Sequence, residues 1–467
     1  MGNSNSDSRR TGTKQLPVFE PNPRCVMKVA FLTHEPFYPP SGGGSAEALY
    51  LVQEMVQRGH EVHVFCPSFP EPDKVEKMLV AQPAAGSSRK LTPAPSPEGN
   101  RAGGRTSFVG GAAGGLPGGL ECHLFTTWQM SRYTSLRNFK YIAYPYFLER
   151  LVERVARQVR FELILSQHAI SAVAAGRLKQ RLRLPVVMNF LDYLTGFMET
   201  WPRYLAPRTF IQALERFELS MPNRYQADGV MTVSDTLADY FADAGYSRER
   251  IVPIYYGYDA KLFRPAGPEG GAENGRGGTV VMHGSFDQHH LGPIAADSLR
   301  HVSRNRPGVR FKFVGKQTPA LSRFRQKMEA AIPGLQIECT GFVPYAEIAG
   351  HLAGATVGIV PYEESTGTHC AFVAKIVEYL GAGLPVVSTP LNSARRYFNN
   401  EPAIRFSEFN GESFGQQILS WLDEPTERRR TLGLAASQRV QAELDWSRIS
   451  KKAIDFVEKI QQQQRRI

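Results

Sequence analysis

Few cysteines and no long hydrophobic run limit what this sequence can be. Its five cysteines are odd in number and lack the paired spacing of a zinc site, which favours a reducing compartment over a disulfide-rich secreted fold. No apolar run reaches the roughly 18 residues needed to cross a bilayer, so no transmembrane helix is expected. Residues 1–26 are polar without the apolar core of a signal peptide, and we predict a disordered tail there. These features together predict a cytoplasmic protein.

The sequence also has fewer acidic residues than basic ones. The chain has 55 Lys and Arg against 44 Asp and Glu, which leaves a formal net charge of +11. That sign favours a polyanionic partner, which could be nucleic acid, anionic lipid or a phosphorylated substrate. A chain of 467 residues exceeds what one hydrophobic core normally holds, so two domains are expected.

Strand and helix patterns alternate along the chain, which predicts parallel α/β sheets. The first domain is expected at 27–265 and the second at 279–445, with a Gly- and Glu-rich linker at 267–278 between them. Pro, Gly, Ala and Ser dominate 71–120, and such a composition buries too little apolar surface to offset the entropy of ordering. We therefore predict a disordered insertion there, and an amphipathic helix over 446–467.

The stretch PYEESTGTHCAFVAKIVEYLGAGLPVVST, from Pro361 to Thr389, carries the strongest functional pattern. A short helix is expected within it, and Lys375 and Glu378 should share the helix face opposite the apolar one. On that face Lys375 could neutralise a diphosphate near a helix N-terminus at about His369, and Glu378 could accept from a sugar hydroxyl. The alternative is a solvated ion pair without a ligand. On either interpretation, substitutions of the pair should hardly affect folding.

Three further places in the first half carry candidate ligand groups. Gly43 and Gly44 follow the first expected strand and would let backbone amides approach a phosphate, unless they form only a flexible turn. Asp192 and His168 each follow an expected parallel strand, which is where α/β sheets place ligand groups. Asp192 could serve as a general base, and His168 is a second catalytic candidate. A helix cap or a surface position is the alternative for both.

Several of these motifs resemble family 4 of the GT-B glycosyltransferases. A Lys, a nearby Glu, a small-residue turn and PVVST recur together in that family's donor-binding segment, as they do in 361–389. The run P-x-x-x-GG at 39–44 and ADGVMTVS at 227–234 are similar to other family motifs. The resemblance implies an α/β GT-B fold, in which two Rossmann-like doubly wound domains face each other across a cleft. It also implies that the helix over 446–467 packs back on the first domain.

The same resemblance implies a reaction. A sugar would pass from a nucleotide-diphosphate sugar on the second domain to a hydroxyl acceptor on the first, which is lipid-linked, a polysaccharide or another glycoconjugate. Gly284, Ser285 and Lys316 would join Lys375 at the donor. The absence of an Asp-x-Asp signature agrees with the metal independence expected of this fold, and no cofactor and no nucleic-acid partner are implied.

Two departures from the family pattern bear on the chemistry. The turn GSFDQHH at 284–290 lacks the Arg and Lys that grip donor phosphates in the family, so Lys316 would replace that charge. The first of two family glutamates falls on Cys370, and neighbouring His369 is the nearest polar substitute. The stereochemical outcome, retention or inversion, therefore stays open.

A basic and aromatic run from Trp128 to Tyr146 favours either contact with an anionic bilayer or ordinary half-buried packing. The first alternative would place the protein on the inner face of the plasma membrane. Two other functions compete with sugar transfer. A sugar-nucleotide epimerase of the same fold would need no acceptor, and a non-catalytic polyanion-binding protein would use the basic surface alone.

Overall fold

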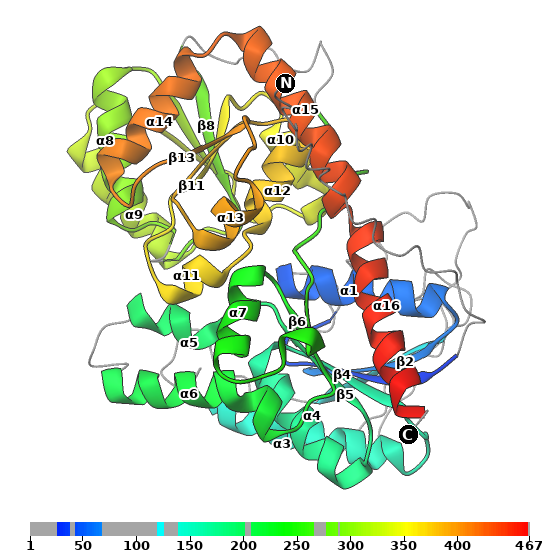
Figure 1. The fold of residues 1–467 in the computed structure, drawn as a ribbon. Coiled ribbons are helices and arrows are strands. Elements are labelled where there is room, and N and C mark those ends of the chain that lie inside the picture. Colours follow the sequence, from blue (N-terminus) through cyan, green and yellow to red (C-terminus); the bar gives the residue numbers. More distant parts are fainter. Residues whose placement is uncertain are drawn as a thin grey trace, which may run out of the picture.

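The computed structural model describes residues 26–37, 43–67, 119–125, 139–200, 207–265, 277–287 and 290–465. They form two α/β domains, one above the other in Figure 1, each with a central sheet covered by helices. The tail expected at 1–26 and the insertion expected at 71–120 lie almost wholly outside these residues, although Leu120 already begins a strand.

The first domain is built on a seven-stranded sheet of order β3-β2-β1-β4-β5-β6-β7, in which every neighbouring pair is parallel. Its strands carry buried apolar runs because helices cover both faces of such a sheet. The strands are β1 Lys28–Thr33, β2 Glu61–Pro67, β3 Leu120–Phe125, β4 Leu163–Gln167, β5 Val186–Phe190, β6 Gly229–Thr232 and β7 Ile251–Pro253. The helices are α1 Gly43–Gln57, α3 Phe139–Ala156, α4 His168–Leu182, α5 Leu194–Phe197, α6 Arg208–Arg224 and α7 Asp235–Asp243.

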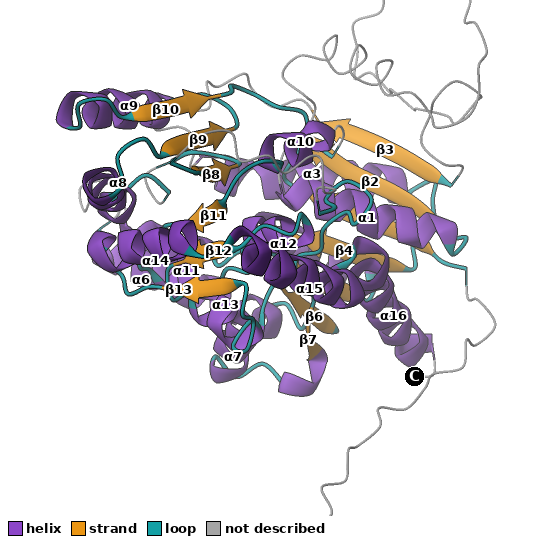
Figure 2. Cartoon of the chain, turned by 90° about the horizontal axis from the view of Figure 1, so that it is seen from above, coloured by secondary structure: helices purple, strands orange, loops and turns teal. Residues whose placement is uncertain are grey.

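The second domain holds a six-stranded parallel sheet of order β10-β9-β8-β11-β12-β13. Its strands are β8 Thr279–His283, β9 Arg310–Val314, β10 Gln336–Cys339, β11 Val357–Val360, β12 Val386–Ser388 and β13 Ile404–Phe406. Its helices are α8 Pro293–Asn305, α9 Pro319–Ala331, α10 Ile348–Leu352, α11 Thr366–Cys370, α12 Ala374–Gly381, α13 Asn392–Tyr397, α14 Gly411–Asp423 and α15 Thr426–Leu444. Figure 2 shows both sheets from above.

Both sheets follow the doubly wound order, in which the chain direction across the sheet reverses once. The reversal lies between β1 and β4 in the first domain and between β8 and β11 in the second. Ligands of such sheets bind outside the carboxyl ends of the strands at this point. The topology therefore selects two small groups of loops as candidate sites.

The last helix, α16 (Trp446–Arg465), leaves the second domain and packs against α1 of the first (Figure 1). The indole of Trp446 stacks on the ring of Tyr50 with centroids 5.0 Å apart. Phe456 packs so closely on β6 that a Cβ at Gly229 would lie 2.7 Å from its ring. The amphipathic pattern of this helix thus fixes one domain to the other.

One local expectation needs correction. The stretch from Pro361 forms two helices, α11 and α12, separated by residues 371–373, and the longer one begins at Ala374, so His369 is not at its N-terminus. Gly43 and Gly44 are the first residues of α1, so their backbone amides lie at a helix N-terminus and the alternative of a separate turn does not hold.

The interfacial run Trp128–Tyr146 lies partly outside the described residues. Of its described side chains, Tyr144 is half-buried against Phe125, with ring centroids 5.4 Å apart, and Tyr146 is exposed. In the described part of the chain, no helix combines the length and the apolar character that crossing a membrane requires.

Candidate functional site

Glycine at position 284 lets the side chain of Lys375 approach the backbone at the reversal point of the second sheet. Gly284 follows β8 directly and has a φ of +107°, a conformation that side chains other than glycine rarely adopt. A Cβ there would lie 3.0 Å from Cε and 3.3 Å from Nζ of Lys375. The backbone at Gly284 and the ammonium of Lys375 therefore occupy one small volume at the carboxyl end of the sheet.

Lys375 is buried, with 8% of its surface exposed. Its Nζ donates to the hydroxyl of Tyr362 over 3.0 Å and lies 3.5 Å from Nε2 of His290. Among the described residues, no carboxylate oxygen forms an ion pair within 4.0 Å of Nζ. A buried charge is costly unless it is paired. Burial excludes the alternative of a solvated pair on an exposed helix face, and within the described part of the chain the cation lacks a carboxylate counter-ion.

Glu378 is also buried, with 4% exposed, so it does not form a solvated pair with Lys375. Its Oε2 lies 2.6 Å from Nε2 of His283, and its Oε1 accepts from the hydroxyl of Tyr345 over 3.0 Å. The backbone N–H of His283 in turn donates to Tyr379 over 3.0 Å. Glu378 is therefore held in a protein network, and a substitution there should affect folding, contrary to the expectation from the sequence.

His369 and Cys370, at and beside the position of the family's first glutamate, form hydrogen bonds with other parts of the protein. His369 lies in the last turn of α11, where Nδ1 accepts from the backbone N–H of Asn392 over 3.2 Å. The side chain of Cys370 is fully buried, and its carbonyl accepts from Ser234 of the first domain over 2.6 Å. Burial, with a smaller contribution from the carboxylate of Glu218, raises the pKa of the Cys370 thiol to about 12. Cys370 is consequently a neutral thiol that cannot replace a carboxylate.

Ser285 and Lys316, two other expected donor contacts, are exposed at the ends of β8 and β9. These strands are neighbours in the sheet, so both side chains border the turn that contains Gly284. The backbone is tight there, since a Cβ at Gly315 would overlap the carbonyl oxygen of Gly284.

At the reversal point of the first sheet, the structure brings together His168, Gly44 and Glu35. The ring of His168 packs edge-on against His34, with centroids 4.8 Å apart, and its Nε2 lies 3.9 Å from Glu35 Oε2. A Cβ at Gly44 would lie 2.7 Å from the same Nε2, so glycine is needed to admit the imidazole. Gly43 is approached by the ring of Tyr256, which would lie 3.1 Å from a Cβ at that position.

Carboxyl groups gather beside this point. Burial, together with the charges of Glu35 and Glu218, raises the pKa of Asp192 to about 7. Burial likewise raises the pKa of Glu47 to about 8, although Asn189 donates to its Oε1 over 3.0 Å. Asp192 is thus a carboxyl group that exchanges its proton near neutral pH, which suits general-base chemistry.

The two domains touch through α5 and α11 next to Asp192. The backbone N–H and hydroxyl of Thr366 donate to the carboxylate of Glu199 over 2.8 and 2.6 Å. Glycines at 196 and 367 permit the approach, because a Cβ on either would overlap the backbone of the other helix. Figure 1 shows the two short helices side by side between the domains. The groups at the two reversal points therefore face a common interdomain region.

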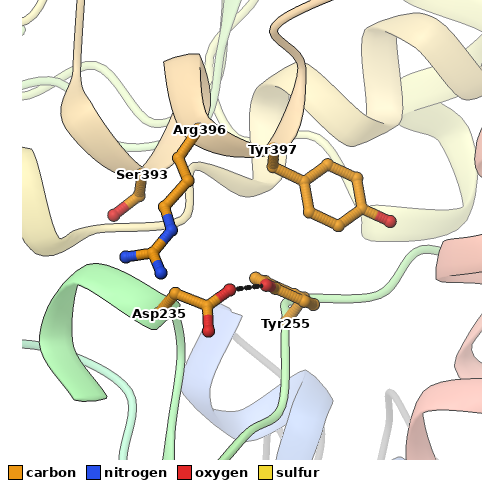
Figure 3. Close-up of a pocket in the computed structure, with 5 residues that line it drawn as sticks. All are labelled: Asp235, Tyr255, Ser393, Arg396 and Tyr397. Atoms are coloured by element: carbon orange, nitrogen blue, oxygen red, sulfur yellow. Dashed lines mark hydrogen bonds between the residues drawn. The ribbon is translucent and has the colours of Figure 1, made fainter. Parts of the chain in front are cut away.

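A small pocket lies elsewhere between the domains (Figure 3). It measures about 260 Å³ and is lined by Asp235, Tyr255, Ser393, Arg396 and Tyr397. The hydroxyl of Tyr255 donates to Asp235, and Arg396 pairs with Asp239 over 2.5 Å. Ligand sites usually occupy about 300–1,000 Å³. This pocket is therefore a hydrogen-bonded contact between domains and too small for a nucleotide sugar.

Sequence reasoning missed several residues that now define the candidate site. His283 ends β8 and Tyr362 lies two residues after β11, so both flank the reversal point and could have been found once the strand order was known. His290, Tyr345 and Glu47 lie on loops or helices, and no local pattern marks them.

These two domains and their facing reversal points define the GT-B class of glycosyltransferase folds. The family model for a glycosyl transferase 4-like domain matches residues 42–257, and the model for glycosyl transferases group 1 matches residues 277–424. The chain is a glycosyltransferase made of these two domains in that order. The resemblance inferred from the sequence motifs is thereby confirmed.

Solved structures agree on the fold. Sucrose-phosphate synthase from Thermosynechococcus elongatus aligns with a TM-score of 0.70 at 15% identity, covering 93% of this chain and 99% of that one. Anabaena HepE in complex with UDP and glucose aligns with a TM-score of 0.64 at 16% identity, covering 93% and 100%. WaaG, a glycosyltransferase involved in lipopolysaccharide biosynthesis, aligns with a TM-score of 0.58 at 16% identity, covering 91% and 98%. No curated protein matches the sequence.

Proposed function

We propose that this glycosyltransferase binds a nucleotide-diphosphate sugar at the reversal point of its second sheet and transfers the sugar to a hydroxyl acceptor held by the first domain. One observation carries the proposal. The ammonium of Lys375 is buried against Gly284, donates to the hydroxyl of Tyr362 and has no carboxylate counter-ion among the described residues. A diphosphate bound beside Gly284 would supply the missing negative charge.

The chemistry follows from where negative charge develops. As the bond from the sugar to the diphosphate breaks, the leaving oxygen gains negative charge, and Lys375 would stabilise that charge electrostatically. Lys316 and Ser285, exposed beside the same turn, would add a charge and a hydroxyl to the phosphates. We infer that these groups suffice without a metal ion or a cofactor. Solved structures of the similar protein HepE contain UDP with glucose or UDP-glucose, which supports a nucleotide-sugar donor.

Asp192 is the proposed general base toward the acceptor hydroxyl. Because its pKa is raised to about 7, the active carboxylate is lost as the pH falls below neutrality. We expect kcat/KM to rise with pH through about 7 in the wild type. Asp192→Asn should transfer sugar far more slowly, without that pH dependence. A normal rate and an unchanged pH profile in the variant would assign the base role to another group, with His168 as the next candidate.

The acceptor is proposed to be lipid-linked or part of a polysaccharide or glycoconjugate, reached from the cytoplasmic face of a membrane. The formal charge of +11 and the basic residues between Trp128 and Tyr146 support contact with anionic lipid. Changing Arg132, Arg137 and Lys140 together to Gln should reduce co-sedimentation with phosphatidylserine vesicles at low salt. Equal sedimentation of variant and wild type would remove the membrane surface from the proposal.

The direct test is a thermal-shift screen of the full chain against the diphosphates of uridine, guanosine, adenosine and thymidine and their sugars. A ligand that binds only the folded state raises the melting temperature by mass action. We expect one nucleotide to stabilise the protein, and its sugars then to be consumed only when an acceptor is supplied. Conversion of a nucleotide sugar without an acceptor would favour an epimerase, and the absence of any stabilisation or turnover would reject the donor site.

A further inference from the structure

Two histidines and a glutamate gather on β2 and β3, the strand pair at the edge of the first sheet, whereas Lys375 belongs to α12 of the second domain (Figure 2). Strand β2 provides His63, and β3 provides Glu121 and His123. In the parallel register His63 is opposite Glu121, and Phe65 is opposite His123. The pairing of the two strands, rather than sequence spacing, therefore brings the three side chains together.

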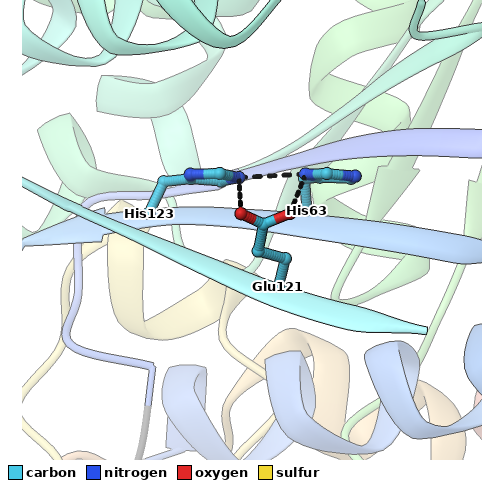
Figure 4. A group of neighbouring side chains, drawn as sticks. All are labelled: His63, Glu121 and His123. Carbon is cyan, nitrogen blue, oxygen red and sulfur yellow. Dashed lines mark hydrogen bonds and ion pairs between the residues drawn. The ribbon is translucent and has the colours of Figure 1, made fainter. Parts of the chain in front are cut away.

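The ligand atoms of this cluster are close enough to share one ion. Nδ1 of His63 lies 2.9 Å from Nε2 of His123 and 3.4 Å from Oε2 of Glu121, and His123 Nε2 lies 3.9 Å from Glu121 Oε1. Two ligands that each bind one zinc ion at about 2.1 Å lie at most about 4.2 Å apart. Each separation meets that limit, the two to Glu121 through its two different oxygens, and one ligand atom taken from each residue keeps all three within 4.8 Å of one another. Figure 4 shows the carboxylate of Glu121 directed toward the facing nitrogens of the two rings.

The surroundings hold His63 in the form that a metal requires. Its other nitrogen, Nε2, lies 2.9 Å from Oε1 of Glu61, whose second oxygen pairs with Lys28 over 2.7 Å. A carboxylate at Nε2 favours the tautomer with its proton there and leaves Nδ1 as the coordinating nitrogen. The imidazole is 2% exposed and packs edge-on against Phe161, with centroids 5.2 Å apart. Its orientation is therefore fixed before any ion arrives.

We propose that His63, Glu121 and His123 bind a divalent transition-metal ion, with Zn²⁺ as the expected occupant. Two imidazole nitrogens and one carboxylate oxygen form a ligand set that suits zinc, and water can complete a four-coordinate shell at this partly exposed edge. The ion would replace the contact between the two imidazoles with bonds from both to one centre. It would join β2 to β3, the strands that flank residues 68–118 in the sequence.

The site is structural in this proposal and separate from sugar transfer. None of its residues lies at either reversal point, where the donor and acceptor groups gather. Metal binding stabilises the folded chain because the ligands come together only when β2 and β3 are paired. Loss of the ion should therefore lower the melting temperature and leave turnover below that temperature unchanged.

The test uses the full chain after treatment with a chelator and dialysis. Calorimetric titration with ZnCl₂ should give one ion per chain, and a melting temperature several degrees higher with zinc than without. His123→Gln should abolish both effects. Glu121→Gln, which changes a more exposed side chain and so is expected to fold, should weaken zinc binding at least tenfold. His351→Gln, a histidine on α10 outside the cluster, is the matched control and should behave as the wild type does.

Cobalt provides a readout specific to coordination. Co²⁺ added to the wild type should give the visible absorption of a nitrogen-ligated, low-symmetry site, and His123→Gln should lack it. The proposal is overturned if the wild type binds no zinc, or if Glu121→Gln and His123→Gln bind it as the control does. In that outcome the cluster is an ordinary hydrogen-bonded histidine pair.

Discussion

Replacing Lys375 by methionine separates electrostatic catalysis from packing. Methionine keeps most of the aliphatic stem that packs near Gly284 and removes only the ammonium. If Lys375 stabilises the leaving diphosphate, turnover should fall by about 10²- to 10³-fold, the loss measured when one preorganised donor to a developing anion is removed. The nucleotide-induced rise in melting temperature should shrink as well, because the donor loses its buried counter-charge.

The stability of the Lys375→Met variant without ligand, in contrast to its turnover, should increase slightly or stay unchanged. The ammonium is buried without a carboxylate partner among the described residues, so its removal leaves no opposite charge unpaired. Its two contacts, Tyr362 and His290, lie 2.9 Å from each other and remain hydrogen bonded. We therefore expect the melting temperature of Lys375→Met without ligand to equal or exceed that of the wild type.

The assay is sugar transfer at saturating donor, together with thermal denaturation with and without the nucleotide identified in the ligand screen. Lys327→Met, an exposed lysine on α9, is the matched control and should alter neither measurement. Wild-type turnover and a wild-type nucleotide shift in Lys375→Met would refute the reasoning. A large loss of stability would show instead that the ammonium is paired with a carboxylate in the folded protein.

Three further variants test the polar groups and the domain contact. Glu378→Gln removes charge-assisted hydrogen bonds from His283 and Tyr345, each worth about 1.5–3 kcal/mol, so its melting temperature should drop clearly, and an unchanged melting curve would contradict the buried network. The pKa of Glu47 is raised from 4.5 to about 8, so stability from its bound proton is complete below about pH 4.5 and is lost as the pH rises through about 8. Glu47→Gln should therefore gain stability relative to the wild type between pH 5 and 8 in thermal denaturation, whereas parallel curves would refute the shift. Gly367→Ala would place a Cβ against the backbone of α5, so the radius of gyration in small-angle X-ray scattering should increase and kcat/KM should fall; no change in either would show that the contact is dispensable.

Much of the architecture is determined by the sequence alone. Continuous apolar runs such as Lys28–Thr33 and Val386–Ser388 alternate with amphipathic helices. This pattern predicts a parallel α/β sheet, because helices on both faces of such a sheet bury the strands. The same local patterns place Lys375 and Glu378 on one helix of the donor segment. The amphipathic pattern after Trp446 likewise yields a helix, because its period does not depend on what it packs against.

Only the tertiary structure decided what those residues face. Helical spacing places Lys375 and Glu378 near each other but says nothing of His283, Tyr345 and Tyr362, which come from other segments and bury the pair. The strand order decides which loops flank the reversal points, and it depends on crossovers that no local pattern specifies. Burial, in turn, raises the pKa of Asp192, which the sequence could place only at a strand end. Contacts between residues distant in the sequence form when the chain folds, so the local sequence determines the elements and the packing of those elements determines their chemistry.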